Sequence, residues 1–147
     1  MSVLLDRDTR VIVQGLGREG RFHAGRMKEY GTKVVGGTKP GAGGTTIDEI
    51  PMFDTVASAV DETGANASII FVPAAAAMDA LLEAIDAQIS LVIAITEGIP
   101  VADMLKVAAV LETASTTLVG PNCPGAITPG ESKIGRASCR ERVSIDV

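Results

Sequence analysis

The stretch VIVQGLGREG, residues 11–20, carries the glycine spacing G-x-G-x-x-G at Gly15, Gly17 and Gly20, directly after a short apolar run. Between a strand and a helix, this spacing is typical of a turn that holds a dinucleotide or another phosphate-bearing ligand. Glycine permits positive φ and a close backbone approach, and the amino terminus of the next helix supplies N–H groups and a partial positive charge. The stretch therefore predicts a strand–turn–helix unit with a phosphate site, and a plain tight turn is the alternative.

Outward from this stretch, strand-like and helical segments alternate along the chain. Short β-branched runs bounded by turn residues predict strands at residues 10–14, 33–36, 67–72, 91–95 and 116–119. Helices are expected at residues 20–30 and 56–62 and after Pro73 and Pro100, the last two with apolar stripes at Met78, Leu81, Leu82 and Ile85 and at Val101, Leu105, Ala108 and Leu111. This order predicts a single α/β domain with a doubly wound parallel sheet. In such a sheet the ligand lies at the carboxyl ends of the strands, where the strand order reverses.

The composition limits the class of protein. The chain has 147 residues, of which 46% are hydrophobic and 3% aromatic, without Trp, so aliphatic side chains must build one core. The formal charge of −5 argues against a nucleic-acid ligand. The apolar runs are too short to cross a bilayer and the first residues lack the pattern of a leader, so we expect a cytoplasmic protein without a membrane contact. Cys123 and Cys139 do not have the spacing of a zinc site, and no metal ligand is expected.

The end of the second strand bears on the identity of the phosphate ligand. An NAD site carries a carboxylate there, about 20 residues after the glycine turn, to bind the ribose 2′-hydroxyl. This chain instead has Thr38 and Lys39. A lysine suits an additional phosphate on the adenosine ribose, which both NADP and coenzyme A carry. A solvated lysine in a surface loop is the alternative.

Two later loops also follow expected strands. Glu97, in the segment Ile95-Thr96-Glu97, lies close to a ligand or only carries a favourable charge at the start of a helix. Cys123 stands between two prolines and beside Asn122. This setting predicts a rigid, solvent-facing thiol, although a buried structural cysteine is the commoner case.

The segments QGLGREGRFHAGRM, EYGTKVVGGTKPGAGGTT, ITEGIP, GPNCPG and ITPGESKIG, in this order and spacing, resemble the amino-terminal domain of the succinate–CoA ligase alpha subunit. The resemblance runs from Met1 to about Gly135 and implies a Rossmann-like, CoA-binding domain. The family enzyme belongs to the tricarboxylic acid cycle and couples succinyl-CoA cleavage to nucleoside triphosphate synthesis through a phosphohistidine. A lysine is common in the family where Ala42 stands, which leaves Lys39 as the replacement charge. The CoA-binding residues expected here are Gly15, Gly17, Arg18, Glu19, Gly20, Lys39, Ala42, Pro73, Ile95, Thr96 and Glu97, with Asn122 and Cys123 near the thiol end.

The resemblance also implies what this segment does not contain. In the family the phosphorylated histidine lies in a second domain, and a separate beta subunit binds the nucleotide. His23 is the one histidine of the chain, and its helical spacing with Met27 and Tyr30 predicts a packing role. We therefore expect CoA and a beta subunit as partners, no catalytic residue, and no activity of the segment alone. The alternatives are a related malate–CoA or citrate–CoA ligase, an NADP-binding Rossmann domain, or a stand-alone CoA-binding regulator.

The last twelve residues, RASCRERVSIDV, depart abruptly from the family pattern. We expect a CoA-binding domain at residues 1–135 and a non-native, disordered tail at residues 136–147, which has the appearance of a translated sequencing adapter joined to a truncated reading frame. A natural solvated tail is the alternative.

Deletion of residues 136–147 tests the expectation for the tail. Because these residues are polar and lack apolar periodicity, the deletion should change the free energy of unfolding by less than about 0.5 kcal/mol, the usual range for surface changes. Urea denaturation of the two chains measures the difference. A loss of several kcal/mol would show that the tail packs on the domain.

Overall fold

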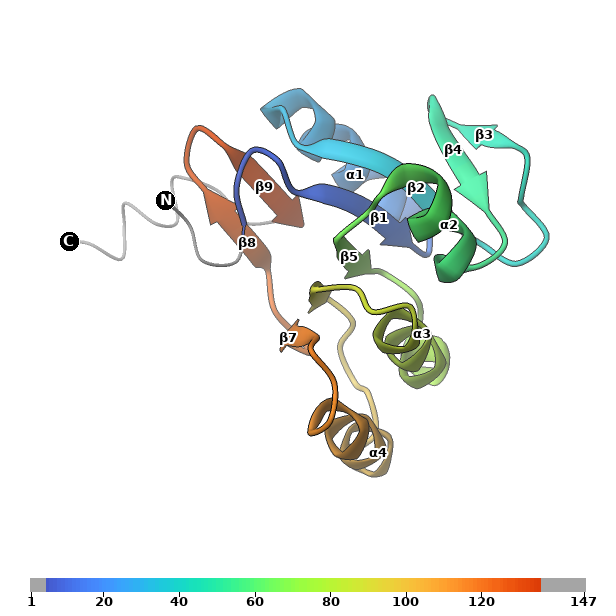
Figure 1. The fold of residues 1–147 in the computed structure, drawn as a ribbon, viewed down its shortest axis with the longest axis vertical. Coiled ribbons are helices and arrows are strands. Elements are labelled where there is room, and N and C mark those ends of the chain that lie inside the picture. Colours follow the sequence, from blue (N-terminus) through green and yellow to red (C-terminus); the bar gives the residue numbers. More distant parts are fainter. Residues whose placement is uncertain (1–4, 136–147) are drawn as a thin grey trace.

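The central element of the structure, a computed structural model that describes residues 5–135, is strand β1 (Arg10–Gln14). It pairs in parallel with β2 (Lys33–Thr38) on one side and with β5 (Ala67–Ile70) on the other. The full sheet has the order β3-β4-β2-β1-β5-β6-β7, and only β3 runs antiparallel to its neighbour (Figure 1). The remaining strands are β3 (Thr46–Ile47), β4 (Ile50–Phe53), β6 (Leu91–Ala94), β7 (Thr117–Val119), β8 (Gly125–Thr128) and β9 (Ser132–Gly135).

Two apolar layers cover the sheet because the side chains of β1 alternate between its faces. Val11 and Val13 belong to one layer, together with residues of helix α1 (Arg18–Tyr30) and of the β8–β9 hairpin. Ile12 belongs to the other layer, which includes residues of the three later helices. The helices are α1 (Arg18–Tyr30), α2 (Val56–Thr63), α3 (Ala74–Asp86) and α4 (Val101–Leu111). The prediction of a single α/β domain with a Rossmann-like, doubly wound sheet is confirmed.

The strand order reverses between β1 and β5. From β1 the chain passes through α1 to β2 on one side, and later continues from β5 through β6 to β7 on the other. The turns that leave β1 and β5 therefore lie side by side, and the N–H of Phe71 donates to the carbonyl oxygen of Gln14 at 2.9 Å. This is the point at which ligands bind in open parallel sheets.

Four strands were not expected from the sequence. The loop after β2 continues into the β3–β4 hairpin, whose turn residues Asp48 and Glu49 have φ of 50° and 67°. Asn-Gly or Asp-Gly is the usual sequence of such a turn, so the pattern gave no hairpin signal. The β8–β9 hairpin was also missed. The expected strand at residues 67–72 ends at Ile70, and α1 begins at Arg18, two positions earlier than expected.

The apolar stripe expected on α4 is wrong for Val101, Leu105 and Ala108, which are exposed, and is confirmed only for Leu111. Val101 and Leu105 are 76% and 67% exposed, whereas Val107 is fully buried. Met104 and Leu111 lie on the face of Val107 and pack against the same layer. This alanine-rich helix has two apolar faces, and the face that contains Val107 is the one that packs on the core. Within the described residues, none of the helices has the length and apolarity needed to cross a membrane.

The β8–β9 hairpin is fixed to the carboxyl end of α1. The hydroxyl of Thr32 donates to the carbonyl oxygen of Lys133 at 2.6 Å and accepts from its N–H at 2.8 Å. The hydroxyl of Tyr30 accepts from the N–H of Gly130 at 2.9 Å. The hydroxyl of Ser132, 1% exposed, has no hydrogen-bond partner among residues 5–135. A buried hydroxyl without a partner destabilises the folded state.

Substitution of Ser132 tests this imbalance. Ser132→Ala should raise the free energy of unfolding by about 1 kcal/mol, because it removes a buried group that lost its water without gaining a partner. Thr32→Val is the control and should lower it by about 1–2 kcal/mol, since two hydrogen bonds are lost. Urea denaturation measures both. A loss of stability in Ser132→Ala would mean that its hydroxyl is bonded in solution.

Candidate functional site

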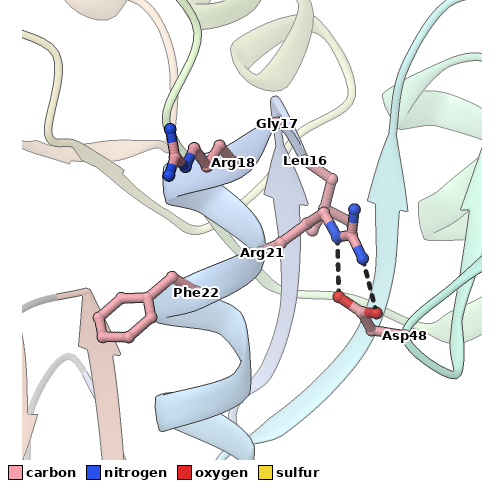
Figure 2. Close-up of a pocket in the computed structure, with 6 residues that line it drawn as sticks. All are labelled: Leu16, Gly17, Arg18, Arg21, Phe22 and Asp48. Carbon is pink, nitrogen blue, oxygen red and sulfur yellow. Dashed lines mark hydrogen bonds and ion pairs between the residues drawn. The ribbon is translucent and has the colours of Figure 1, made fainter.

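Three grooves meet around the turn after β1. The first, which we call the Lys39 groove, has a volume of about 400 Å³ and lies between the ends of β1 and β2 and helix α3. The Glu97 groove, of about 360 Å³, lies between the first turn of α1 and the loops after β5 and β6. The Arg21 groove, of about 430 Å³, lies between α1 and the β3–β4 turn (Figure 2). Gly17 lines the Lys39 groove and the Arg21 groove, and Val72 lines the Lys39 groove and the Glu97 groove.

The three glycines of the turn, Gly15, Gly17 and Gly20, lie in different structural surroundings. Gly15 has φ of +95°, and a Cβ there would come within 2.9 Å of the backbone nitrogen of Val72. A Cβ on Gly20 would overlap the carbonyl oxygen of Gly15, so only glycine lets α1 start this close to β1. Gly17 differs, because no atom lies within 4 Å of its Cβ position. Its backbone is therefore open to a ligand, as in phosphate-binding turns of this type.

The amino terminus of α1 is available to an anion. Gly17 is the N-cap and makes no side-chain capping bond to the first-turn amides. Arg18 is exposed and lines the Arg21 groove, while Glu19 in the same turn lines the Glu97 groove. The helix terminus and Arg18 favour a phosphate, and Glu19 favours a hydroxyl or an amide donor. The two sides of the turn thus suit different parts of a ligand.

Lys39 lies where the sequence predicted, at the end of β2 and in a groove with Gly15 and Gly17. Its side chain is exposed, and its N–H donates to the carbonyl oxygen of Phe53 at 3.1 Å. Asp79 and Glu83 of α3 line the same groove. Glu83 already accepts from the N–H of Val56 at 2.6 Å. The groove therefore offers a cation for a phosphate and the carboxylate of Asp79 for a hydroxyl group.

The loop after β6 is tied to its neighbours. The hydroxyl of Thr96 donates to the carbonyl oxygen of Val72 at 2.7 Å, and its own carbonyl oxygen accepts from the N–H of Asn122 at 3.1 Å. Glu97 is exposed beside Pro73, whereas the side chain of Ile95 is 5% exposed and belongs to the core. Only the backbone of Ile95 is thus able to face a ligand.

Four of the expected residues do not line the grooves. Gly20 is buried beneath the turn, and Ala42 packs its methyl group on the core layer of α1. Asn122 is exposed. Cys123 is half-buried rather than solvent-facing, because it packs against the same layer and its Sγ lies 3.3 Å from the carbonyl oxygen of Ala94.

His23 packs against two aromatic rings, which agrees with the packing role that its helical spacing predicted. Its ring lies parallel to that of Phe71 at 5.6 Å and edge-on to that of Phe22 at 5.0 Å. Its Nε2 is 3.9 Å from Oε1 of Glu19. No group of three or more side chains suited to a metal ion occurs in the described part of the chain.

One feature of the site, the ion pair of Arg21 and Asp48, has no signal in the sequence pattern (Figure 2). Nε and Nη2 of Arg21 donate to the two carboxylate oxygens of Asp48 at 2.9 and 3.0 Å. The hydrogen bond from Arg21 lowers the pKa of Asp48, and that bond raises the pKa of Arg21. The pair is therefore ionised at neutral pH and is lost only as the pH falls through the lowered pKa of Asp48.

Comparisons with known proteins agree with a phosphate-bearing ligand at the turn after β1. Residues 6–98 match the family described as CoA binding domain. The chain is 57% identical over 138 residues to the succinate–CoA ligase [ADP-forming] subunit alpha of Aquifex aeolicus. The aligned region covers 92% of this chain and 45% of that protein. Subunit alpha 2 of Archaeoglobus fulgidus is 52% identical over 136 residues, with 92% and 47% covered. The chain thus spans about half the length of the curated relatives it matches.

The fold also occurs in a larger enzyme. ATP citrate lyase from Methanothrix soehngenii, solved in complex with citrate and coenzyme A, superposes with a TM-score of 0.79 over 90% of this chain and 24% of that one. The sequences are 23% identical, so this likeness concerns the fold. The family match confirms the expectation of coenzyme A as the cofactor. The chain belongs to the CoA-binding domain family, in the form found in succinate–CoA ligase alpha subunits.

Proposed function

We propose that residues 1–135 are the CoA-binding domain of a succinate–CoA ligase alpha subunit, and that CoA lies across the carboxyl edge of the sheet. The observation that carries this proposal is the open backbone at Gly17, at an amino terminus of α1 without a side-chain cap, where the three grooves meet. An elongated ligand with phosphates near its middle fits such an arrangement better than a compact one.

The phosphate end of CoA is assigned to the Lys39 groove. Its pyrophosphate approaches Gly17 and the first amides of α1, with Arg18 as a further cation. The 3′-phosphate on the ribose pairs with Lys39, and Asp79 is placed to accept from a sugar or adenine donor. The chain carries a net charge of −5, so the attraction for this anion is local rather than global.

The pantetheine arm is assigned to the Glu97 groove. Amide groups of the arm find acceptors in Glu19 and Glu97 and an apolar wall at Pro73. The thiol end then points toward Asn122, which is bonded to the loop after β6, and Cys123, which is bonded to the last residue of β6. These two residues are neighbours of the reacting end and not catalysts.

In the full ligase this domain presents CoA to chemistry performed elsewhere. We propose that the phosphorylated histidine belongs to the remaining length of the alpha subunit and that a beta subunit binds the nucleotide. The segment alone then binds CoA without turnover. Its cytoplasmic location stays a prediction. Sister ligases of malate and citrate remain the alternative for the acyl substrate.

Substitution of Lys39 tests the assigned 3′-phosphate. A charge-assisted hydrogen bond contributes about 1.5 kcal/mol at an exposed site, so Lys39→Ala should weaken CoA by about tenfold. Dephospho-CoA, which lacks this phosphate, should bind the wild type and Lys39→Ala with the same affinity. Isothermal titration measures the four affinities. Lys106 is an exposed lysine on α4, and Lys106→Ala is the matched control. It should change neither the affinity for CoA nor the affinity for dephospho-CoA. Equal losses for the two ligands would remove Lys39 from the site, and NADPH binding tighter than CoA would favour a dehydrogenase domain.

Substitution of Gly17 separates an effect on CoA binding from an effect on folding. Gly17 has φ of −83°, which alanine adopts without strain, and its Cβ position is open. Gly17→Ala should therefore keep the fold, at a loss of no more than about 1 kcal/mol for alanine at an N-cap. It should weaken CoA by about tenfold or more, because the methyl group occupies the approach of the phosphate. Gly25→Ala, also at an open position in α1, should leave CoA affinity unchanged and stabilise the helix by about 0.5–1 kcal/mol. Wild-type affinity in Gly17→Ala would contradict the assigned phosphate position.

A further inference from the structure

The Arg21–Asp48 pair joins two elements that are distant along the chain. Arg21 lies one turn into α1, and its N–H donates to the carbonyl oxygen of Gly17 at 2.9 Å. Asp48 lies at the tip of the β3–β4 hairpin. Figure 2 shows the guanidinium of Arg21 directed at Asp48, while Arg18 and Phe22 project from the other side of the helix.

The turn at Asp48 includes one residue in a conformation that it does not favour. Asp48 and Glu49 both have positive φ. Aspartate tolerates this region, whereas positive φ costs free energy for a glutamate. Such a conformation persists when surrounding contacts determine it. Two hydrogen bonds from Arg21 to the carboxylate of Asp48 are contacts of this kind.

The hairpin in turn holds the loop that begins at Lys39. The N–H of Met52 donates to the carbonyl oxygen of Thr45 at 2.9 Å, and the N–H of Gly44 donates to that of Met52 at 3.2 Å. The N–H of Gly43 donates to the carboxylate of Asp54, beyond β4, at 2.9 Å. The loop and the hairpin are therefore bonded to each other, and the loop follows the hairpin when it moves.

We propose that Arg21 and Asp48 are positioning residues, whose ion pair clamps the β3–β4 hairpin to the first turn of α1 and thereby sets the Lys39 loop for CoA. The clamp rests on the proposed function of that loop. Both side chains are about half exposed, at 51% and 49%, so the pair contributes little to global stability. Its effect falls on the position of Lys39 relative to Gly17 at the start of α1, since both residues line the Lys39 groove.

Charge-removing variants test the clamp. Arg21→Met keeps the length of the side chain, and Asp48→Asn keeps a residue that tolerates positive φ. Each should weaken CoA by about two- to fivefold, the range that corresponds to the coupling of an exposed pair. The double variant should be no weaker than the single ones, because each removes the same interaction. Arg21→Lys should recover part of the affinity. Arg26→Met, which breaks the exposed Arg26–Glu29 pair on the same helix, is the control and should bind as the wild type.

A second measurement separates positioning from loss of structure. Melting temperatures should stay unchanged in both single variants, while amide hydrogen exchange at residues 41–49 accelerates. Wild-type CoA affinity in both variants, additive losses in the double variant, or unchanged exchange would overturn the clamp. If the wild-type chain itself fails to bind CoA, the proposed function fails, and hydrogen exchange still decides whether the pair holds the loop.

Discussion

The structure depends on the close backbone contact between the turns that leave β1 and β5. Gly15 lies against the backbone nitrogen of Val72, where a Cβ would come within 2.9 Å. Beneath this contact, the side chain of Gln14 accepts from the hydroxyl of Ser68 at 2.6 Å and donates to the carbonyl oxygen of Ala80 at 2.9 Å. Buried polar groups bonded on both sides fix β1, β5 and α3 to one another. The open edge above them is where the three grooves converge.

This constraint explains how an acidic protein binds an anion. The net charge of −5 repels CoA at long range, and attraction comes from groups that the turn brings together. The α1 amides, Arg18 and Lys39 supply it within one edge of the sheet. A larger hollow of about 620 Å³ lies between the carboxyl ends of α3 and α4, lined by residues such as Asp86 and Gln88. It lies away from the carboxyl ends of the strands, where open parallel sheets bind their ligands.

Much of the fold could be predicted because its signals are local. The glycine spacing located the turn after β1, and five β-branched runs located the central strands. The β3–β4 hairpin was missed because the Asp48–Glu49 turn lacks the usual glycine and β3 has only two residues. The stripe on α4 was assigned to the wrong side because alanine and valine occupy several faces of that helix. Among the expected site residues, Gly15, Gly17 and Lys39 line one groove, and their role in binding CoA stays a prediction. The Arg21–Asp48 pair depends on a tertiary contact between residues 27 positions apart, which no local spacing indicates.

An NMR titration of the chain with CoA, followed through the backbone amides, locates the ligand directly. CoA at the carboxyl edge of the sheet should give saturable shifts in the turn at residues 15–20, in the loop at residues 39–45 and in the loops that follow β5 and β6. Shifts confined to the hollow between the ends of α3 and α4, or none at millimolar CoA, would contradict the assignment of CoA to the carboxyl edge of the sheet.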